Sequence, residues 1–102
     1  MAVDLPPRHL AEVGRILATL VPDVEVWAFG SRVDGRAKPH SDLDLAIFSA
    51  QSLAPGRVAA LAEAFAESDL PFRVDVVDLA SVEPAFREII ERSHEVIRTA
   101  DR

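Results

Sequence analysis

The sequence contains no cysteine, and only 11 of its 102 residues are lysine or arginine, against 17 aspartates and glutamates. The absence of cysteine excludes a disulfide framework, a thiol nucleophile and any cysteine-based zinc site. The acidic balance, a formal net charge of −6, argues against a protein that follows the backbone of nucleic acids, because such proteins need a basic surface. No run of about 18 apolar residues is present, so no membrane-spanning helix is expected.

The N-terminus also lacks the basic and then apolar layout of a signal peptide, since it reads MAVDLPPRH. The overall composition, 49% apolar and 27% charged, is that of an ordinary globular protein. These features predict a cytoplasmic protein with no membrane contact and no direct contact with nucleic acid. The length predicts one domain over residues 1–102, with room for one core.

Hydrophobic periodicity predicts a small α+β fold. Apolar residues recur at helical spacing in three segments and alternate in three others, with proline and glycine between them. We predict helices over 7–20, 56–68 and 82–92, strands over 24–29, 42–48 and 72–79, a loop over 30–41 with at most one short helical turn, and an edge strand or frayed end over 95–98. This order predicts a two-layer α+β (α/β two-layer) fold, a small sheet with helices mainly on one face and the other face open.

The last helix carries two finer predictions. Ser81 precedes it and is a residue type that caps helix N-termini. We expect Phe86, Ile89 and Ile90 to pack inward from this helix against the sheet.

Three aspartates are predicted to share the open face of the sheet. Asp42 and Asp44 are two residues apart on a strand, so their carboxylates point the same way, roughly 6.5 Å apart at the backbone. Asp75 lies on a later strand between two valines that face the core, and therefore projects to the same face. If the two strands are neighbours, about 4.8 Å apart, the three carboxylates converge. Carboxylates this close repel each other unless a cation sits between them, and oxygen ligands suit hard cations. The pattern predicts a site for two Mg²⁺ ions of the kind used in phosphoryl or nucleotidyl transfer.

The end of the first strand supplies a complementary feature. Gly30 allows close approach of backbone, and Ser31 offers a hydroxyl and a backbone N–H at the start of a turn. Arg32, with Arg36 and Lys38 further along the loop, is expected to neutralise phosphate charge. Together with the aspartates, this loop predicts a nucleotide and metal site.

These residues resemble a known family. Gly30-Ser31, ten further residues and then Asp42-Leu43-Asp44 match the GS-x10-DxD signature of polymerase-β-like nucleotidyltransferases. The longer strings GSRVDGRAKPHSDLDLAIF and RVDVVDL resemble the minimal nucleotidyltransferases (MNT), over the whole chain. Two positions depart from the common pattern, because Asp34 stands where many members have a basic residue and His40 where many have glycine.

The resemblance implies a bare polymerase-β-like catalytic core that acts as the antitoxin of a HEPN/MNT toxin–antitoxin pair. It implies Mg²⁺-dependent transfer of AMP from ATP to a tyrosine of a HEPN ribonuclease encoded nearby, with which the chain could form a hetero-oligomer. By position, Gly30 and Ser31 match the phosphate loop, and Asp42 and Asp44 match the metal-bridging pair. Asp75 matches the third carboxylate, which binds one metal and assists deprotonation of the attacking hydroxyl.

Two other functions remain open. The chain could neutralise its toxin by direct binding, with the acidic face as the docking surface and no catalysis. Transfer to a small molecule such as an aminoglycoside is a weaker alternative, because a chain of this length has no residues to spare for a substrate pocket. Trp27 is either a core residue or a stacking surface for a base or partner, and Asp78 is interpreted as a strand-end or capping residue on the opposite face from Asp75.

Overall fold

The alternating segment at the middle of the sequence forms the central strand of the fold. In the computed structural model, which describes residues 3–100, this strand is β2 (Leu43–Phe48), and its Leu43, Leu45 and Ile47 are fully buried. The intervening Asp44 projects to the other side of the sheet, as the two-residue period of a strand requires. The predicted alternation of this strand is confirmed.

Four strands form one mixed sheet in the order β3-β2-β1-β4. The neighbours of β2 are β1 (Glu25–Phe29), which runs antiparallel to it, and β3 (Val74–Asp78), which runs parallel. The fourth strand, β4 (His94–Arg98), pairs antiparallel with β1 and forms one edge of the sheet. The register places Asp44 opposite Phe29 on one side and opposite Asp75 on the other. Two of the three predicted carboxylates are therefore direct neighbours across the sheet.

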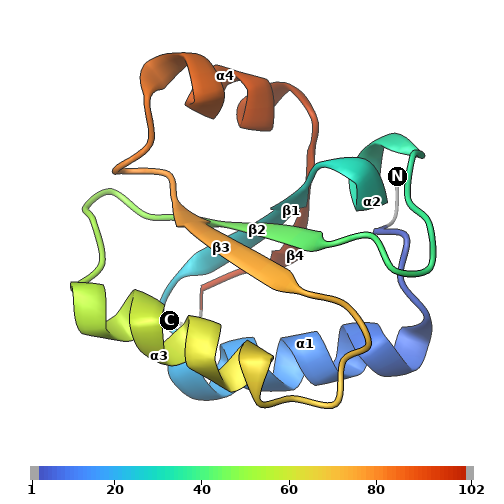
Figure 1. The fold of residues 1–102 in the computed structure, drawn as a ribbon. Helices are drawn as coiled ribbons and strands as arrows, with labels where there is room; N and C mark the ends of the chain where they lie inside the picture. The colour runs from blue at the N-terminus through green and yellow to red at the C-terminus, as the bar shows by residue number, and fades with distance from the viewer. Residues whose placement is uncertain (1–2, 101–102) are drawn as a thin grey trace.

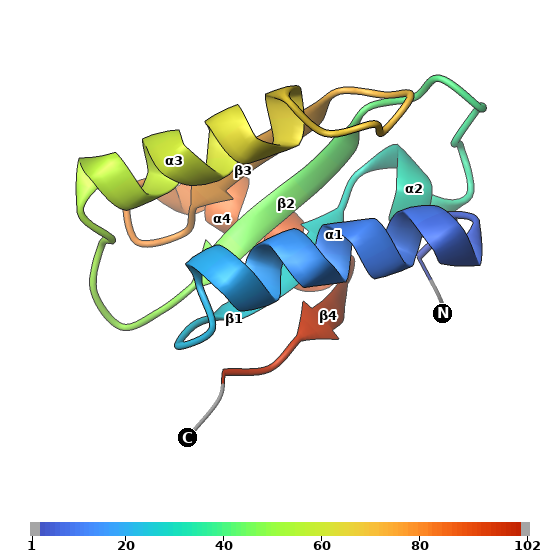
Figure 2. The same cartoon turned by 90° about the horizontal axis from the view of Figure 1, so that it is seen from below.

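Two helices cover one face of the sheet and enclose the main core. They are α1 (Pro7–Leu20) and α3 (Pro55–Ala66), which lie side by side below the strands in Figure 1 and cross the near face in Figure 2. Both begin with a proline in the first turn, where the missing N–H costs nothing. The main core joins apolar side chains of both helices to the strand residues that point toward them, among them Leu17, Leu45 and Leu61. The α+β architecture with helices mainly on one face is confirmed.

The opposite face is less open than predicted. The helix α4 (Pro84–Arg92) lies on this side of the sheet, above the strands in Figure 1. Ile90 of this helix packs in a second, smaller core with Trp27, Ala46 and Leu79. The prediction of a fully open face is wrong, because the sheet carries apolar side chains on both faces and the second set needs its own cover.

The finer predictions for α4 are confirmed for Ile90 and wrong for the Ser81 cap and for Ile89. The helix begins at Pro84, Glu83 stands at its N-cap, and no side chain caps it. The hydroxyl of Ser81 instead lies 2.9 Å from that of Ser52. Of the residues expected to pack inward, only Ile90 is buried, whereas Ile89 is 63% exposed and Phe86 is 39% exposed. A helix of nine residues over a small apolar cluster buries a single position rather than a full stripe.

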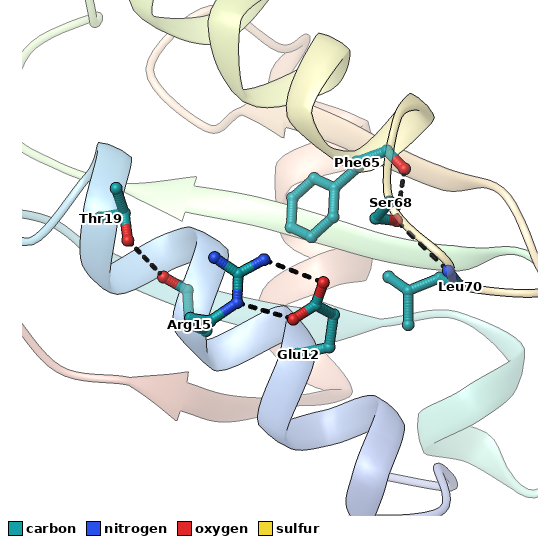
Figure 3. A network of polar contacts seen from close by, with 6 residues as sticks. All are labelled: Glu12, Arg15, Thr19, Phe65, Ser68 and Leu70. Carbon is teal, nitrogen blue, oxygen red and sulfur yellow. Dashed lines mark hydrogen bonds and ion pairs between the residues drawn. The ribbon is translucent and has the colours of Figure 1, made fainter.

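The helix-covered face also carries a groove of about 430 Å³ between α1 and α3. Figure 3 shows the polar contacts along it, where Arg15 donates two hydrogen bonds to Glu12 and the hydroxyl of Ser68 donates to the carbonyl of Phe65. Because these side chains are paired locally and lie on the other side of the sheet from Asp44, the groove is separate from the carboxylates. Within residues 3–100, no helix combines the length and the apolar character needed to cross a bilayer.

Candidate functional site

The turn that follows β1 is shaped by one glycine. Gly30 has φ +81° and ψ −153°, a backbone conformation that is essentially restricted to glycine. Its carbonyl accepts hydrogen bonds from the backbone N–H groups of Val33 and Asp34, which starts the short helix α2 (Ser31–Asp34). Ser31 is the first residue of this helix, so the predicted helical turn is confirmed.

Gly30 also lies in direct contact with one of the predicted carboxylates. A Cβ atom built on Gly30 would lie 2.5 Å from Oδ2 of Asp44, a distance that no real pair of such atoms tolerates. This contact follows from the sheet register, since Phe29, the last residue of β1, pairs with Asp44. The structure therefore brings the predicted phosphate loop and the predicted metal ligands to one place.

The three aspartates gather at the same end of the sheet. Asp44 and Asp75 are paired in the parallel register of β2 and β3, and Asp42 immediately precedes β2. Asp42 and Asp75 have side chains that are 45% and 43% exposed, so they face solvent while attached to a rigid sheet. The predicted convergence of the three residues on one side of the sheet agrees with this placement.

Arg73 lies between two of these carboxylates. Its Nη2 atom is 3.4 Å from Oδ2 of Asp42, and its Nε atom is 3.2 Å from Oδ1 of Asp75. The backbone of Arg73 is held as well, because its carbonyl accepts a hydrogen bond from the N–H of Leu43. The sequence analysis did not identify this residue, although the signal was present: Arg73 is two residues before Asp75 and therefore shares its face of the sheet.

The electrostatics of the cluster act most strongly on Asp44. Partial burial raises the pKa of Asp44 above its ordinary value, the negative charges of Asp75 and Asp42 raise it further, and the positive charge of Arg73 opposes them. A carboxylate in this position is stabilised by any additional cation. Asp42 and Asp75 share the guanidinium of Arg73, so the negative charge of the three aspartates exceeds the positive charge beside them.

The donor set fits a hard cation such as Mg²⁺, which prefers carboxylate oxygens. As the side chains are placed, no three histidine, aspartate or glutamate residues within 3–100 are arranged to hold a metal ion. Mg²⁺ is usually held by one or two carboxylates together with substrate phosphates, rather than by a cage made of protein. The carboxylate oxygens and the uncompensated negative charge of the cluster therefore fit Mg²⁺. Arg73 occupies the position between Asp42 and Asp75.

Arg32 has a different role from the expected phosphate contact. Its side chain is buried, with 4% of the residue exposed, and lies over the ring of Phe72 at 4.4 Å. The guanidinium donates hydrogen bonds to backbone carbonyls, of which Ser41 accepts two and Asp4 accepts one. Because these donors are used within the fold, Arg32 fixes the loop that leads to Asp42 rather than pointing at the carboxylates.

The remaining loop residues are placed as follows. Asp34 forms an ion pair with Arg36, Oδ2 to Nη2 at 2.7 Å, and these hydrogen bonds hold the pKa of Asp34 below its ordinary range. The acidic group that departs from the family pattern is thus neutralised by its own neighbour. His40 is exposed. Asp78, as interpreted from the sequence, accepts hydrogen bonds from the backbone N–H groups of Leu53 and Ala80.

Trp27 is a core residue on the face that carries the aspartates. It is 6% exposed and is stacked between Phe48 and His94, with ring centroids 4.6 Å and 3.8 Å away. Its indole N–H donates to Glu25. The sequence analysis assigned no role to His94, because nothing in one sequence indicates that β4 pairs with β1 and brings this ring to Trp27.

Comparison with known proteins places this geometry in context. The family model described as "Polymerase beta, Nucleotidyltransferase" matches residues 16–102. A relative from Haemophilus influenzae, "Probable protein adenylyltransferase MntA", is 51% identical over 100 residues, which is 98% of this chain and 88% of that protein.

Solved structures agree in fold. One chain of a toxin–antitoxin complex with AMP-PNP matches this chain with a TM-score of 0.74 and is 25% identical to it. The match covers 89% of this chain and 73% of the solved chain. One chain of a complex between a tri-AMPylated Shewanella oneidensis HEPN toxin and MNT antitoxin matches with a TM-score of 0.69 at 23% identity. The match covers 91% of this chain and 71% of the solved chain. The match of most of the chain to the family model, together with the identity of half its residues to a known member, shows that the chain belongs to the polymerase-β-like nucleotidyltransferases, among the minimal nucleotidyltransferases.

Proposed function

We propose that this chain transfers AMP from ATP to a tyrosine hydroxyl of a HEPN ribonuclease toxin and thereby acts as the antitoxin of that toxin. The main support for the proposal is that Gly30 contacts Asp44, and Asp44 pairs with Asp75, at one end of the sheet. The relative named as a protein adenylyltransferase and the AMPylated toxin bound to an MNT antitoxin support this acceptor class.

The residues of the chain have distinct tasks in this reaction. Asp42, Asp44 and Asp75 would hold Mg²⁺, and we propose two ions. The metal would supply positive charge to neutralise the triphosphate and Lewis acidity to polarise the α-phosphoryl group. Gly30 lets the backbone approach the phosphates, and Ser31 donates a hydrogen bond to them. Asp75 accepts the proton of the attacking hydroxyl.

The transfer is a substitution at the α-phosphorus of ATP. The bond between the tyrosine oxygen and the α-phosphorus forms, the bond from that phosphorus to the bridging oxygen breaks, and pyrophosphate leaves in line. Asp44 and Asp75 lie on the paired strands β2 and β3, so the sheet rather than a loop fixes the relative positions of these two carboxylates. The exposure of Asp42 and Asp75 leaves room for a side chain of a partner, with which the chain forms a hetero-oligomer.

Intact mass spectrometry of the toxin tests the proposal. The HEPN protein encoded beside this chain is incubated with the chain, ATP and Mg²⁺, and in parallel with an ATP analogue that cannot be cleaved between the α- and β-phosphates. We expect mass increments of AMP only with ATP, and none with the Asp42→Asn, Asp44→Asn double variant. Peptide mapping locates the modification, and an acceptor other than tyrosine would contradict that part of the proposal.

The alternative, neutralisation by contact, predicts no AMP increment in that experiment and a different result in an assay of ribonuclease activity. An antitoxin that acts by binding suppresses the ribonuclease equally with and without ATP, and with or without both aspartates. We further propose a cytoplasmic location, which is consistent with the absence of cysteine and with the use of ATP.

A further inference from the structure

We propose that Arg73 is the resident counter-cation of the carboxylate cluster, which positions Asp42 and Asp75 in the metal-free protein and must be displaced before a divalent cation binds between them. This inference rests on the proposed metal-dependent function and adds a positioning residue to it. Arg73 is the first residue of the RVDVVDL string, and the resemblance described above assigns it no role.

The geometry places the guanidinium where a bridging cation would bind. Arg73 contacts Asp42 through Nη2 and Asp75 through Nε and Nη2, with separations of 3.4, 3.2 and 3.3 Å. Asp42 immediately precedes β2 and Asp75 lies in β3, so the contacts tie the start of β2 to β3 through side chains as well as backbone. A divalent ion and the guanidinium compete for the same oxygens.

The charge balance explains why an arginine is tolerated at this position. Three aspartates carry −3 at neutral pH, and Arg73 reduces the local sum to −2. Without it, the negative charges of Asp42 and Asp75 would repel each other and that of Asp44 with no cation between them. Because the side chain of Arg73 is 72% exposed, its ion pairs are screened by water and can be broken at small cost. Arg73 therefore holds Asp42 and Asp75 in place without blocking the access of a metal ion to them.

Displacement of Arg73 leaves the guanidinium next to the metal and next to the nucleotide phosphates. A planar guanidinium binds phosphate oxygens through two parallel hydrogen bonds. The same residue therefore replaces the cation in the metal-free protein and is free to contact the triphosphate once the cation has bound. Because of this exchange, the metal would bind more tightly in the presence of the nucleotide than in its absence.

The test measures Mn²⁺ binding to the metal-free protein by electron paramagnetic resonance, without nucleotide. Arg73→Gln should bind Mn²⁺ about 3- to 10-fold more tightly than the wild type, as expected from the loss of two exposed ion pairs. Arg73→Lys keeps the positive charge and should bind more weakly than Arg73→Gln. Adding Asp44→Asn to either protein should abolish binding, which shows that the signal comes from this cluster.

Arg15→Gln is the matched control. Arg15 is 65% exposed, is paired with Glu12, and lies on α1 on the opposite side of the sheet (Figure 3). Its replacement changes the net charge by the same single unit, from −6 to −7, so any long-range effect of charge is equal in both variants. Arg15→Gln should stay within about twofold of the wild type, because charges beyond about 10 Å are screened.

The outcomes separate this inference from the proposed function. Equal or weaker Mn²⁺ binding by Arg73→Gln, with clear binding by the wild type, overturns the role of Arg73 and leaves the metal site standing. Binding by Arg73→Gln with none by the wild type supports the inference strongly. No binding by either protein overturns the inference, and the proposed metal dependence is then decided separately by AMP transfer with and without Mg²⁺.

Discussion

A Cβ atom on Gly30 would lie 2.5 Å from Oδ2 of Asp44, so the glycine and the carboxylate share a space with no room for another atom. The contact joins the turn after β1 to the centre of β2 and explains why these two motif residues belong together. The ten residues between Ser31 and Asp42 lie in the connection between β1 and β2, and these strands pair with Phe29 opposite Asp44. The following predictions test this arrangement.

Gly30→Ala should lower the free energy of unfolding by about 2–4 kcal/mol, through the strained backbone and the contact with Asp44. Gly35→Ala is the matched control, because Gly35 also has a positive φ, +87°, but nothing lies within 4 Å of its Cβ position. It should cost about 1–2 kcal/mol, the cost of the left-handed backbone. Urea unfolding of the two variants measures the difference, and equal costs would contradict the importance of the contact.

Arg32→Gln should destabilise the protein by about 2–4 kcal/mol, because the partly buried hydrogen bonds from its guanidinium to the carbonyls of Pro39, Ser41 and Asp4 are lost. Arg36→Gln, which removes an exposed ion pair in the same loop, should cost about 1 kcal/mol or less. Urea unfolding again provides the measurement. An Arg32→Gln variant with wild-type stability and weakened ATP binding would restore the phosphate role predicted from the sequence.

Ile90→Ala and Ile89→Ala test how α4 packs. Ile90 is fully buried in the second core, so its truncation should cost about 2–5 kcal/mol. Its neighbour Ile89 is 63% exposed, and its truncation should change stability by about 0.5 kcal/mol or less. Thermal or urea unfolding of the pair decides the register of the helix, and a larger effect at Ile89 would show that the helix is rotated from the position described.

Asp44→Asn should stabilise the metal-free protein at neutral pH. The raised pKa of Asp44 means that the native state holds this proton more tightly than the unfolded chain does. The stability from that proton is fully present below the ordinary carboxyl pKa and is lost as the pH rises through the raised folded pKa. At pH 7 the charge is therefore unfavourable, and its removal should add about 1 kcal/mol or less.

Urea unfolding in the presence of a chelator, over a pH series from about 7 to about 4, checks the sign. The difference between Asp44→Asn and the wild type should shrink as the pH falls, because the wild-type carboxyl becomes neutral. A variant that is less stable than the wild type at neutral pH would contradict the repulsion described for the cluster.

The sequence predicted the parts of this structure that depend on local periodicity. The alternation of Leu43, Leu45 and Ile47 placed Asp44 on the opposite face of the sheet, and the bounds of α1 agree with the prediction. The same period placed Asp75 on the face of Asp44, but their direct pairing depends on β2 and β3 being neighbours, which periodicity does not predict.

The misjudged features depend on contacts between distant segments. Arg32 follows a Gly-Ser turn and resembles a phosphate ligand, but its hydrogen-bond acceptors include a carbonyl 28 residues away, which no local pattern indicates. Ile89 lies on the exposed side of α4, and Phe86 packs against Phe29 at the edge of the second core and stays partly exposed, because the apolar cluster beneath the helix is small. His94 contacts Trp27 only because β4 returns to pair with β1.

The most direct test of the central claim is the rate of AMP transfer to the toxin by Asp44→Asn, compared with Asp78→Asn. Asp78 is an aspartate of the same sheet that binds backbone N–H groups, outside the cluster. The account predicts a loss of about 10³-fold or more for Asp44→Asn, with a native fold, and a change within about tenfold for Asp78→Asn. Transfer by Asp44→Asn within about tenfold of the wild type would contradict it.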